Sequence, residues 1–340
     1  TIALTKVENA EVVWAEQYNT SLDELFAIQD QITSTIVGQL DPKLRTSEIK
    51  RISGKQPERL DAHDCVLRAI YLLNKMSQEY FTEIKNLLYN AISIDSSYSS
   101  AYAWLSFSCL FSVGQGWVQD DGLSITEAEV FSRKALDLDP EDDMALTIAG
   151  HLQSFAYHNF DQGLQLLERA LQLNPNSSFA WATSAATYCY IGEPEEALRR
   201  LAKSRELCPF DPYAVVYENN YSVAYTIAER YSEAVEWGRK VTHDNPTFTN
   251  GYKPLIASLG HLGQTEEARE YIQRLLSLEP EFSISAFSKK YPLQKETDKQ
   301  KYIDGLRKAG VPETSSSMKQ HRDTRTHPGN VIHINQRRRG

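Results

Sequence analysis

Apolar positions recur every three or four residues along most of the chain, which is the pattern of helices that bury one face. From residue 63 onward these helical stretches come in pairs, and five of the pairs end in a proline. The prolines are Pro140, Pro175, Pro209, Pro246 and Pro280, so the successive spacings are 35, 34, 37 and 34 residues. Such near-equal spacing predicts a tandem array of one unit, two helices joined by a turn.

A small residue stands twelve positions before each of these prolines, where the second helix of a unit crosses the first too closely for a larger side chain. These residues are Ala128, Gly163, Ala197, Ala234 and Ala268. Gly192 and Gly263 stand in two of the turns and can supply the left-handed residue that ends the first helix. A period near 34 residues is typical of the tetratricopeptide repeat, so the sequence predicts a mainly α-helical protein, a tetratricopeptide-repeat α-solenoid.

The ends of the chain differ from this array. Residues 2–5 and 11–18 have the pattern of a β-hairpin, and an amphipathic helix follows over residues 22–40. Because two strands cannot form a stable sheet alone, residues 1–45 are interpreted as the C-terminal remnant of a truncated small α/β domain. The solenoid is expected over residues 58–313, with residues 297–309 as a C-terminal cap, and residues 314–340 are expected to be a disordered basic tail.

Charge separates the tail from the rest of the chain. The net charge is −9, with +5 on residues 314–340 and −14 on the remainder. An acidic body argues against general nucleic-acid binding, which needs a basic face. The partner of the tail is left open between a nucleic acid or membrane contact and a solvated end with no specific role. Residues 96–119 carry no charge, but their serines and glycines favour a buried helix over a membrane span.

Motifs for catalysis and cofactor binding are missing from the sequence. There is no Gly-rich phosphate loop, nucleophile elbow or zinc-protease motif, so no catalytic residue, cofactor or metal is expected. Cys65, Cys109, Cys189 and Cys208 are scattered without a CxxC pair. This spacing predicts reduced thiols in a cytoplasmic protein.

Two segments carry a resemblance to a known architecture. Residues 13–18 read Val-Trp-Ala-Glu-Gln-Tyr, and residues 25–33 read Leu-Phe-Ala-Ile-Gln-Asp-Gln-Ile-Thr. Together with Tyr-Ile-Asp-Gly-Leu-Arg-Lys-Ala-Gly-Val-Pro over residues 302–312, they resemble bacterial proteins in which a small α/β domain continues into tetratricopeptide repeats. The chain is thereby similar to the C-terminal regions of class III adenylate/guanylate cyclases and of some winged-helix transcriptional regulators.

This resemblance implies a protein-binding role. The first helix of each repeat lines a concave groove that takes a protein or peptide. Matched to that pattern, the groove residues are Phe179, Ala182, Ala186, Cys189, Tyr190, Asn250, Lys253, Ala257 and His261. Trp117 and Val118 form an apolar pair in the loop over residues 114–122 and are a second candidate contact.

The leading hypothesis is a non-catalytic scaffold, the regulatory or sensory region of a bacterial signalling protein. The parent favoured by the resemblance is a class III nucleotide cyclase, whose catalytic domain would lie before residue 1. The alternative is the effector- or partner-binding region of a winged-helix transcriptional regulator.

Overall fold

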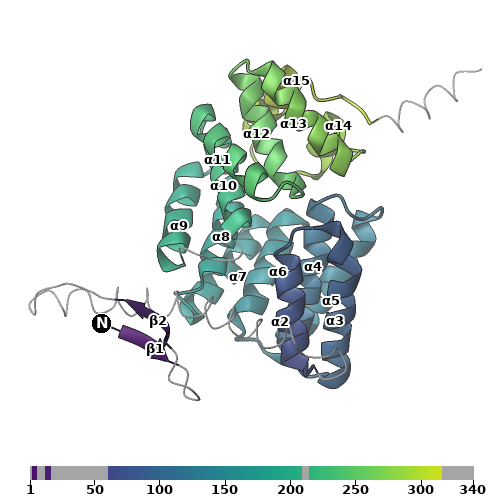
Figure 1. Ribbon diagram of the computed structural model, residues 1–340, viewed down its shortest axis with the longest axis vertical. Helices are drawn as coiled ribbons and strands as arrows, with labels where there is room; N and C mark the ends of the chain where they lie inside the picture. The colour runs from purple at the N-terminus through teal and green to yellow at the C-terminus, as the bar shows by residue number, and fades with distance from the viewer. Residues whose placement is uncertain (1, 6–11, 17–59, 209–213, 316–340) are drawn as a thin grey trace, which may run out of the picture.

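The computed structural model describes residues 2–5, 12–16, 60–208 and 214–315, and within them 14 α-helices follow a pair of strands (Figure 1). The short strands are β1 (Ile2–Thr5) and β2 (Val12–Glu16). The helices of the first half are α2 (Ala62–Leu73), η2 (Gln78–Tyr80, a 3₁₀ turn), α3 (Phe81–Ile94), α4 (Ser99–Gly114), α5 (Asp121–Leu138), α6 (Asp143–Phe155), α7 (Phe160–Leu173) and α8 (Ser178–Tyr190). The second half holds α9 (Pro194–Leu207), α10 (Ala214–Ile227), α11 (Tyr231–Asp244), α12 (Thr249–His261), α13 (Thr265–Leu278), α14 (Ile284–Lys290) and α15 (Glu296–Ala309).

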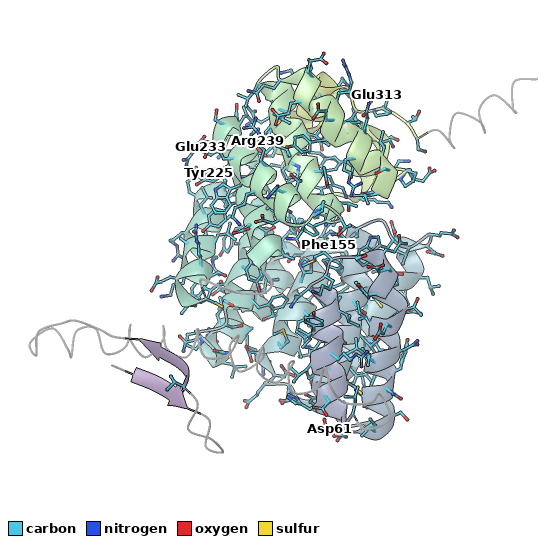
Figure 2. All side chains as sticks on the ribbon, in the orientation of Figure 1. Asp61, Phe155, Tyr225, Glu233, Arg239 and Glu313 are labelled. Carbon is cyan, nitrogen blue, oxygen red and sulfur yellow. The ribbon has the colours of Figure 1, made fainter. Side chains whose placement is uncertain are left out.

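The helices form two layers of a solenoid. Each pair from α2/α3 to α12/α13 packs as a unit, and the first helices α4, α6, α8, α10 and α12 also contact one another in succession. The second helices α5, α7, α9 and α11 each contact the first helix of the next unit from the outer layer. Figure 2 shows this division, with Phe155 of α6 in the middle of the molecule and Glu233 of α11 at its outer edge. The predicted helical solenoid is confirmed.

Close helix crossings explain the small residues that recur in the repeat. The hydroxyl of Ser106 on α4 donates to the carbonyl of Ala128 on α5 at 2.8 Å. Ser222 and Ala234 repeat this contact between α10 and α11, also at 2.8 Å. At Gly163 the approach is closer still, because a Cβ there would lie 2.0 Å from the Ser154 hydroxyl oxygen. Side chain and backbone meet directly at these crossings, so a larger residue would separate the helices.

The turns between the paired helices use a left-handed residue, as predicted. Gly192 and Gly263 have φ values of 74° and 72°, two residues before α9 and α13 begin. Non-glycine residues take the equivalent position in other units, with φ of 54° at His158 and 60° at Glu229. The turn geometry is therefore retained where glycine, the residue that adopts it most readily, is absent.

Helix α15 takes the place that the first helix of a further repeat would occupy. It packs on α12, and the contact is so close that a Cβ on Gly260 would lie 2.0 Å from the carbonyl oxygen of Gly305. Gly310 ends α15 with a φ of 96°. The apolar face that α12 would otherwise leave open is thus covered.

The uncharged segment around α4 is a buried helix, as expected. Ten of the 16 residues of α4 are buried in the array. Among the described residues, no helix combines the length and apolar character needed to cross a bilayer.

At the N-terminus β1 and β2 pair antiparallel, with Ile2 opposite Glu16 and Leu4 opposite Trp14. The helix predicted over residues 22–40 and the tail from residue 316 lie outside the described residues. The interpretation of residues 1–45 as part of an α/β domain stays a prediction.

Candidate binding pocket

The array curls until its first repeats meet α12, and this contact closes one side of the concave face. Buried Gln115, after α4, accepts a hydrogen bond from the backbone N–H of Thr249 through Oε1 at 2.8 Å. The ring of Phe111 stacks on Phe248 with a centroid distance of 6.2 Å. Farther along, the Thr247 hydroxyl donates to the carbonyl of Met76 at 2.9 Å. These contacts, called the closure below, join segments that are 134 and 171 residues apart.

Lys253 ties the closure to the inner face of α12. Its Nζ lies 2.9 Å from Oδ1 of Asn250, 3.3 Å from the carbonyl oxygen of Gly114 and 3.1 Å from Oε2 of Glu279. It also lies 5.5 Å from the centroid of the Phe282 ring. The contacts with Asn250 and Gly114 are hydrogen bonds and the contact with Glu279 is an ion pair, so Lys253 is held within the structure and its charge is balanced there.

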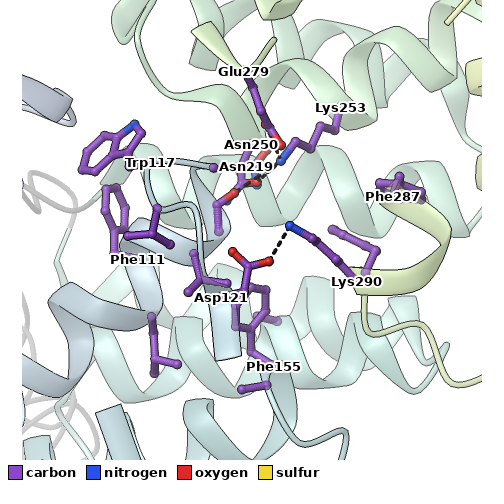
Figure 3. A pocket seen from close by; sticks show the side chains of 18 of the residues that line it. Phe111, Trp117, Asp121, Phe155, Asn219, Asn250, Lys253, Glu279, Phe287 and Lys290 are labelled. Atoms are coloured by element: carbon purple, nitrogen blue, oxygen red, sulfur yellow. Dashed lines mark hydrogen bonds and ion pairs between the residues drawn. The ribbon is translucent and has the colours of Figure 1, made fainter. Parts of the chain in front are cut away.

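Beside the closure lies a pocket of about 800 Å³, enclosed by α4, α6, α8, α10, α12 and α14 (Figure 3). Aromatic side chains come from most sides of its wall; among them are Phe107, Phe155, Phe179, Tyr190, Phe287 and Tyr291. A volume of about 300–1,000 Å³ with an apolar lining is typical of ligand-binding pockets. The pocket is therefore the candidate binding site.

Among the described residues that line the pocket, Asn219 and His151 each have a buried polar atom without a hydrogen-bond partner, Oδ1 and Nδ1 respectively. Burial lowers the pKa of His151 to about 4, so its ring is neutral at pH 7. The ring stacks on Phe155 at 5.4 Å, which holds its plane. A buried polar atom without a partner is destabilising, so a bound group that hydrogen-bonds to either atom would offset this cost. The amide oxygen of Asn219 can only accept such a bond, whereas the role of Nδ1 of His151 depends on the tautomer.

An ion pair between Asp121 and Lys290 crosses the rim of the pocket and joins the start of α5 to the end of α14 (Figure 3). Lys290 is exposed to solvent, whereas the Lys253–Glu279 pair on the opposite wall is enclosed. Both pairs are charge-balanced, so neither presents an uncompensated charge to the interior of the pocket.

Six of the nine predicted groove residues and both loop residues line this pocket. They are Phe179, Ala182, Ala186, Tyr190, Asn250 and Lys253, with Trp117 and Val118. The structure thus brings together residues from two repeats and the loop after α4. That they contact a partner stays a prediction.

Cys189, Ala257 and His261 are the three that the structure does not bring to the pocket. Cys189 is fully buried, with Sγ 3.9 Å from the carbonyl oxygen of Asn220 on α10. Ala257 is buried where α15 covers α12. The His261 ring stacks on Tyr231 at 4.2 Å, and its Nε2 lies 2.9 Å from the carbonyl oxygen of Lys301. The cap occupies the part of the groove where the repeat pattern placed Ala257 and His261.

The sequence prediction missed the pocket residues contributed by α4, α6 and α14, among them Phe107, Phe155 and Phe287. A signal existed for the first two, because they lie on first helices of the repeat, as the predicted residues do. No repeat pattern marks Phe287, which lies in the short helix after the last proline.

Clusters of metal-ligating side chains and reactive thiols are the other features that could carry chemistry. Within the part of the chain that the structure describes, no group of three or more His, Cys, Asp or Glu residues could hold a metal ion. All four cysteines are free and buried. Burial raises the pKa of the Cys109 thiol to about 11, so at pH 7 it is protonated and a poor nucleophile.

Comparisons with known proteins agree with the repeat architecture. The sequence profile of the tetratricopeptide repeat matches residues 258–282. Putative adenylate cyclase 3 of Rhizobium meliloti (strain 1021) is 28% identical over 140 residues, which cover 40% of this chain and 24% of that protein. The match therefore spans about a quarter of the length of this curated relative.

Solved structures are similar in fold at low sequence identity. Human IFIT1, in its dimer with m7Gppp-AAAA, superposes with a TM-score of 0.57 at 15% identity, covering 81% of this chain and 65% of that chain. The Cut9–Hcn1 hetero-tetramer of the APC/C gives a TM-score of 0.53 at 12% identity, covering 78% and 48%. At these identities the likeness concerns the helical solenoid alone.

Proposed function

We propose that this chain is a non-catalytic scaffold whose concave pocket binds a segment of another protein. The observation that carries the proposal is the pocket of about 800 Å³ on the inner layer, which is rich in aromatic side chains and closed on one side by the contact of α4 with the start of α12. Stacked helical repeats present concave surfaces of this kind to their partners. The absence of catalytic motifs in the sequence and the raised pKa of the Cys109 thiol agree with a binding role.

We further propose that the scaffold is the regulatory region of a cytoplasmic bacterial signalling protein, a class III nucleotide cyclase. Its support is the similarity of 140 residues to putative adenylate cyclase 3. The alternative is a winged-helix transcriptional regulator with the same repeats. The coding sequence before Thr1 distinguishes them, because a cyclase requires two metal-binding aspartates there and a regulator a basic helix-turn-helix.

Nucleic acid is the competing class of ligand, because the neighbour IFIT1 is seen with m7Gppp-AAAA. The body of this chain carries a net charge of −14. Of the three lysines that line the pocket, Lys253 and Lys290 are paired with carboxylates, and Lys289 is exposed to solvent. Nucleic-acid binding needs a cluster of unpaired cations, so a protein segment is the better occupant. The basic tail is a separate element whose partner is not assigned.

Site-specific photo-crosslinking tests the scaffold. A photoreactive phenylalanine analogue replaces Ala186, which lines the pocket, or Ala202, which is exposed on α9, in the full chain expressed in its own bacterium. We expect a discrete protein adduct from position 186 that is absent from position 202. The scaffold proposal is wrong if position 186 yields no protein adduct, or if RNase treatment removes the adduct and RNA is recovered from it.

A further inference from the structure

We propose that the pocket selects an uncharged aromatic side chain of the partner, a ring that also donates a hydrogen bond to Oδ1 of Asn219. This inference rests on the proposed scaffold function and adds the chemistry of the group that is recognised. Among the standard side chains, tryptophan and tyrosine combine large rings with a donor. Three features of the pocket carry the inference.

The first feature is the distribution of charge. On the enclosed wall Lys253 is only 7% exposed and is paired with Glu279. At the rim Lys290 is paired with Asp121, and the remaining charged side chains that reach the pocket, Glu281 and Lys289, are exposed. A charged group that enters the enclosed part of the pocket would lose water without gaining an unpaired counter-ion there, which is costly. Neutral occupants are therefore favoured.

The second feature is the unpartnered carbonyl oxygen of Asn219. The residue is 8% exposed, and its Oδ1 has no hydrogen-bond partner among the described residues. In Figure 3 Asn219 lies beside Asn250 and the Lys253–Glu279 pair, across the pocket from Phe155. An amide oxygen in this position is an acceptor without a donor, and a ring N–H or O–H entering the pocket would supply one.

The third feature is the arrangement of the rings. Phe107 and Phe179 pack edge to face at 5.6 Å, and Phe287 stacks on Tyr291 at 4.6 Å, so the walls are preorganised by ring contacts. Aromatic groups gain from edge-to-face and offset contacts beyond simple burial. The pocket is also large enough for one such ring together with the main chain on either side of it.

Equilibrium dialysis of the full chain against three tryptophan derivatives tests the selection. N-acetyl-tryptophanamide is neutral, N-acetyl-tryptophan is an anion, and tryptophanamide carries an amino group that is largely cationic at pH 6. We expect the neutral probe to bind about tenfold more tightly than either charged probe at pH 6. Equal affinities, or tighter binding of a charged probe, would overturn the inference.

Variants locate the binding and the hydrogen bond. Ala186→Leu fills the pocket and should weaken the neutral probe at least fivefold, whereas Ala202→Leu on the exposed face of α9 should leave it unchanged. Asn219→Leu should weaken N-acetyl-tryptophanamide and leave its indole-N-methyl derivative unaffected, because that derivative lacks the ring donor. Equal losses for both probes would show that the ring N–H does not reach Asn219. Circular dichroism melting checks that each variant is folded.

Competition separates this inference from the scaffold function. N-acetyl-tryptophanamide should suppress the protein adduct formed from position 186. An adduct that persists under a saturated probe contradicts aromatic recognition while the scaffold stands. Binding of the neutral probe without any protein adduct contradicts the scaffold and the partner side chain together, and leaves a site for a free small molecule.

Discussion

Two buried cations in this molecule stabilise different kinds of contact. Arg200 on α9 is 6% exposed and Lys253 on α12 is 7% exposed. Arg200 is paired with Glu196 in its own helix and with Glu168 in the preceding unit, both within 32 residues. Lys253, in contrast, reaches the carbonyl of Gly114, 139 residues away.

The other contacts of Arg200 are also local in the sequence. The guanidinium lies 4.5 Å from the ring centroid of Tyr188 and 5.4 Å from that of Trp181, and it donates to the Ser184 hydroxyl at 3.0 Å. All three belong to α8, the partner of α9 in the same repeat. Arg200 therefore joins the two helices of its own repeat, and its ion pair with Glu168 of α7 links that repeat to the preceding one. A solenoid depends on such local interfaces for its global stability.

We therefore expect that a substitution of Arg200 lowers the stability of the whole array, whereas a substitution of Lys253 increases local opening at the closure. A solenoid is stabilised mainly by nearest-neighbour interfaces. A contact between distant units can open locally while those interfaces persist.

Arg200→Met should give the largest effect. It removes two ion pairs, the hydrogen bond to Ser184 and two ring contacts, and we expect a loss of about 2–3 kcal/mol in the free energy of unfolding. Urea denaturation followed by circular dichroism measures it. Arg199→Met is the matched control, because Arg199 bonds to the same Glu196 carboxylate but its side chain is 61% exposed. A comparable loss in both variants would mean that burial is not what gives Arg200 its importance.

Lys253→Met should lower the global free energy of unfolding by about 1 kcal/mol, and its main effect should be local opening of the closure. Hydrogen exchange should accelerate at the amide of Thr249, which donates to Gln115, and at the loop after α4. Amides of α8 and α9 should keep their protection. Lys240→Met, at an exposed pair on α11, is the control and should change neither region. If α8 and α9 lose protection with Lys253→Met, the closure supports the whole array and the contrast with Arg200 fails.

The same contrast explains what the sequence could predict. Ala128, Gly163 and Gly192 satisfy requirements inside one unit, a close crossing or a left-handed turn, so their spacing along the chain reveals them. The contact of Gln115 with Thr249 depends on the rotation accumulated over four units, and no spacing encodes it. Accordingly the inner-face position of Phe179 was predictable, whereas the pocket that encloses it was not.

The sequence also could not predict that His261 is covered by α15. Residues 297–309 could be identified as an amphipathic helix, but the face on which that helix docks is set by packing of α12 against α15. The contact of Gly260 with Gly305 allows the two helices to approach so closely that this end of the groove is filled. A repeat pattern assumes an open groove at every unit, and the last unit departs from it for this reason.

Acid should weaken the contacts around Arg200 in a defined pH window, because their stability depends on the charge of Glu196. Hydrogen bonds from Arg199, together with the bonds and charge of Arg200, lower the pKa of Glu196 to about 2 from its ordinary value of 4.5. Because the folded-state pKa is depressed, Glu196 stabilises the fold above pH 4.5, and this contribution is lost as the pH falls from 4.5 towards 2. Wild type should exceed Glu196→Gln in stability at pH 6 and converge with it near pH 2. A difference between the two that stays constant across this window would contradict the pairing.

Lys290→Ala should give the smallest loss of stability. It tests whether the contribution of an ion pair at the pocket depends on its burial or on the sequence separation of its two residues. Lys290 and Asp121 are farther apart in the sequence than Lys253 and Gly114, yet the Lys290 side chain is 62% exposed. Exposed ion pairs contribute about 0–1 kcal/mol and are screened by salt, so we expect a loss below about 0.5 kcal/mol that disappears at high ionic strength. Urea midpoints at low and high salt measure it, with Lys253→Met alongside. If Lys290→Ala costs as much as Lys253→Met, the distance that a contact spans along the chain would outweigh its burial. The closure would then extend across the rim of the pocket, and a partner would have to break the Asp121–Lys290 pair to enter.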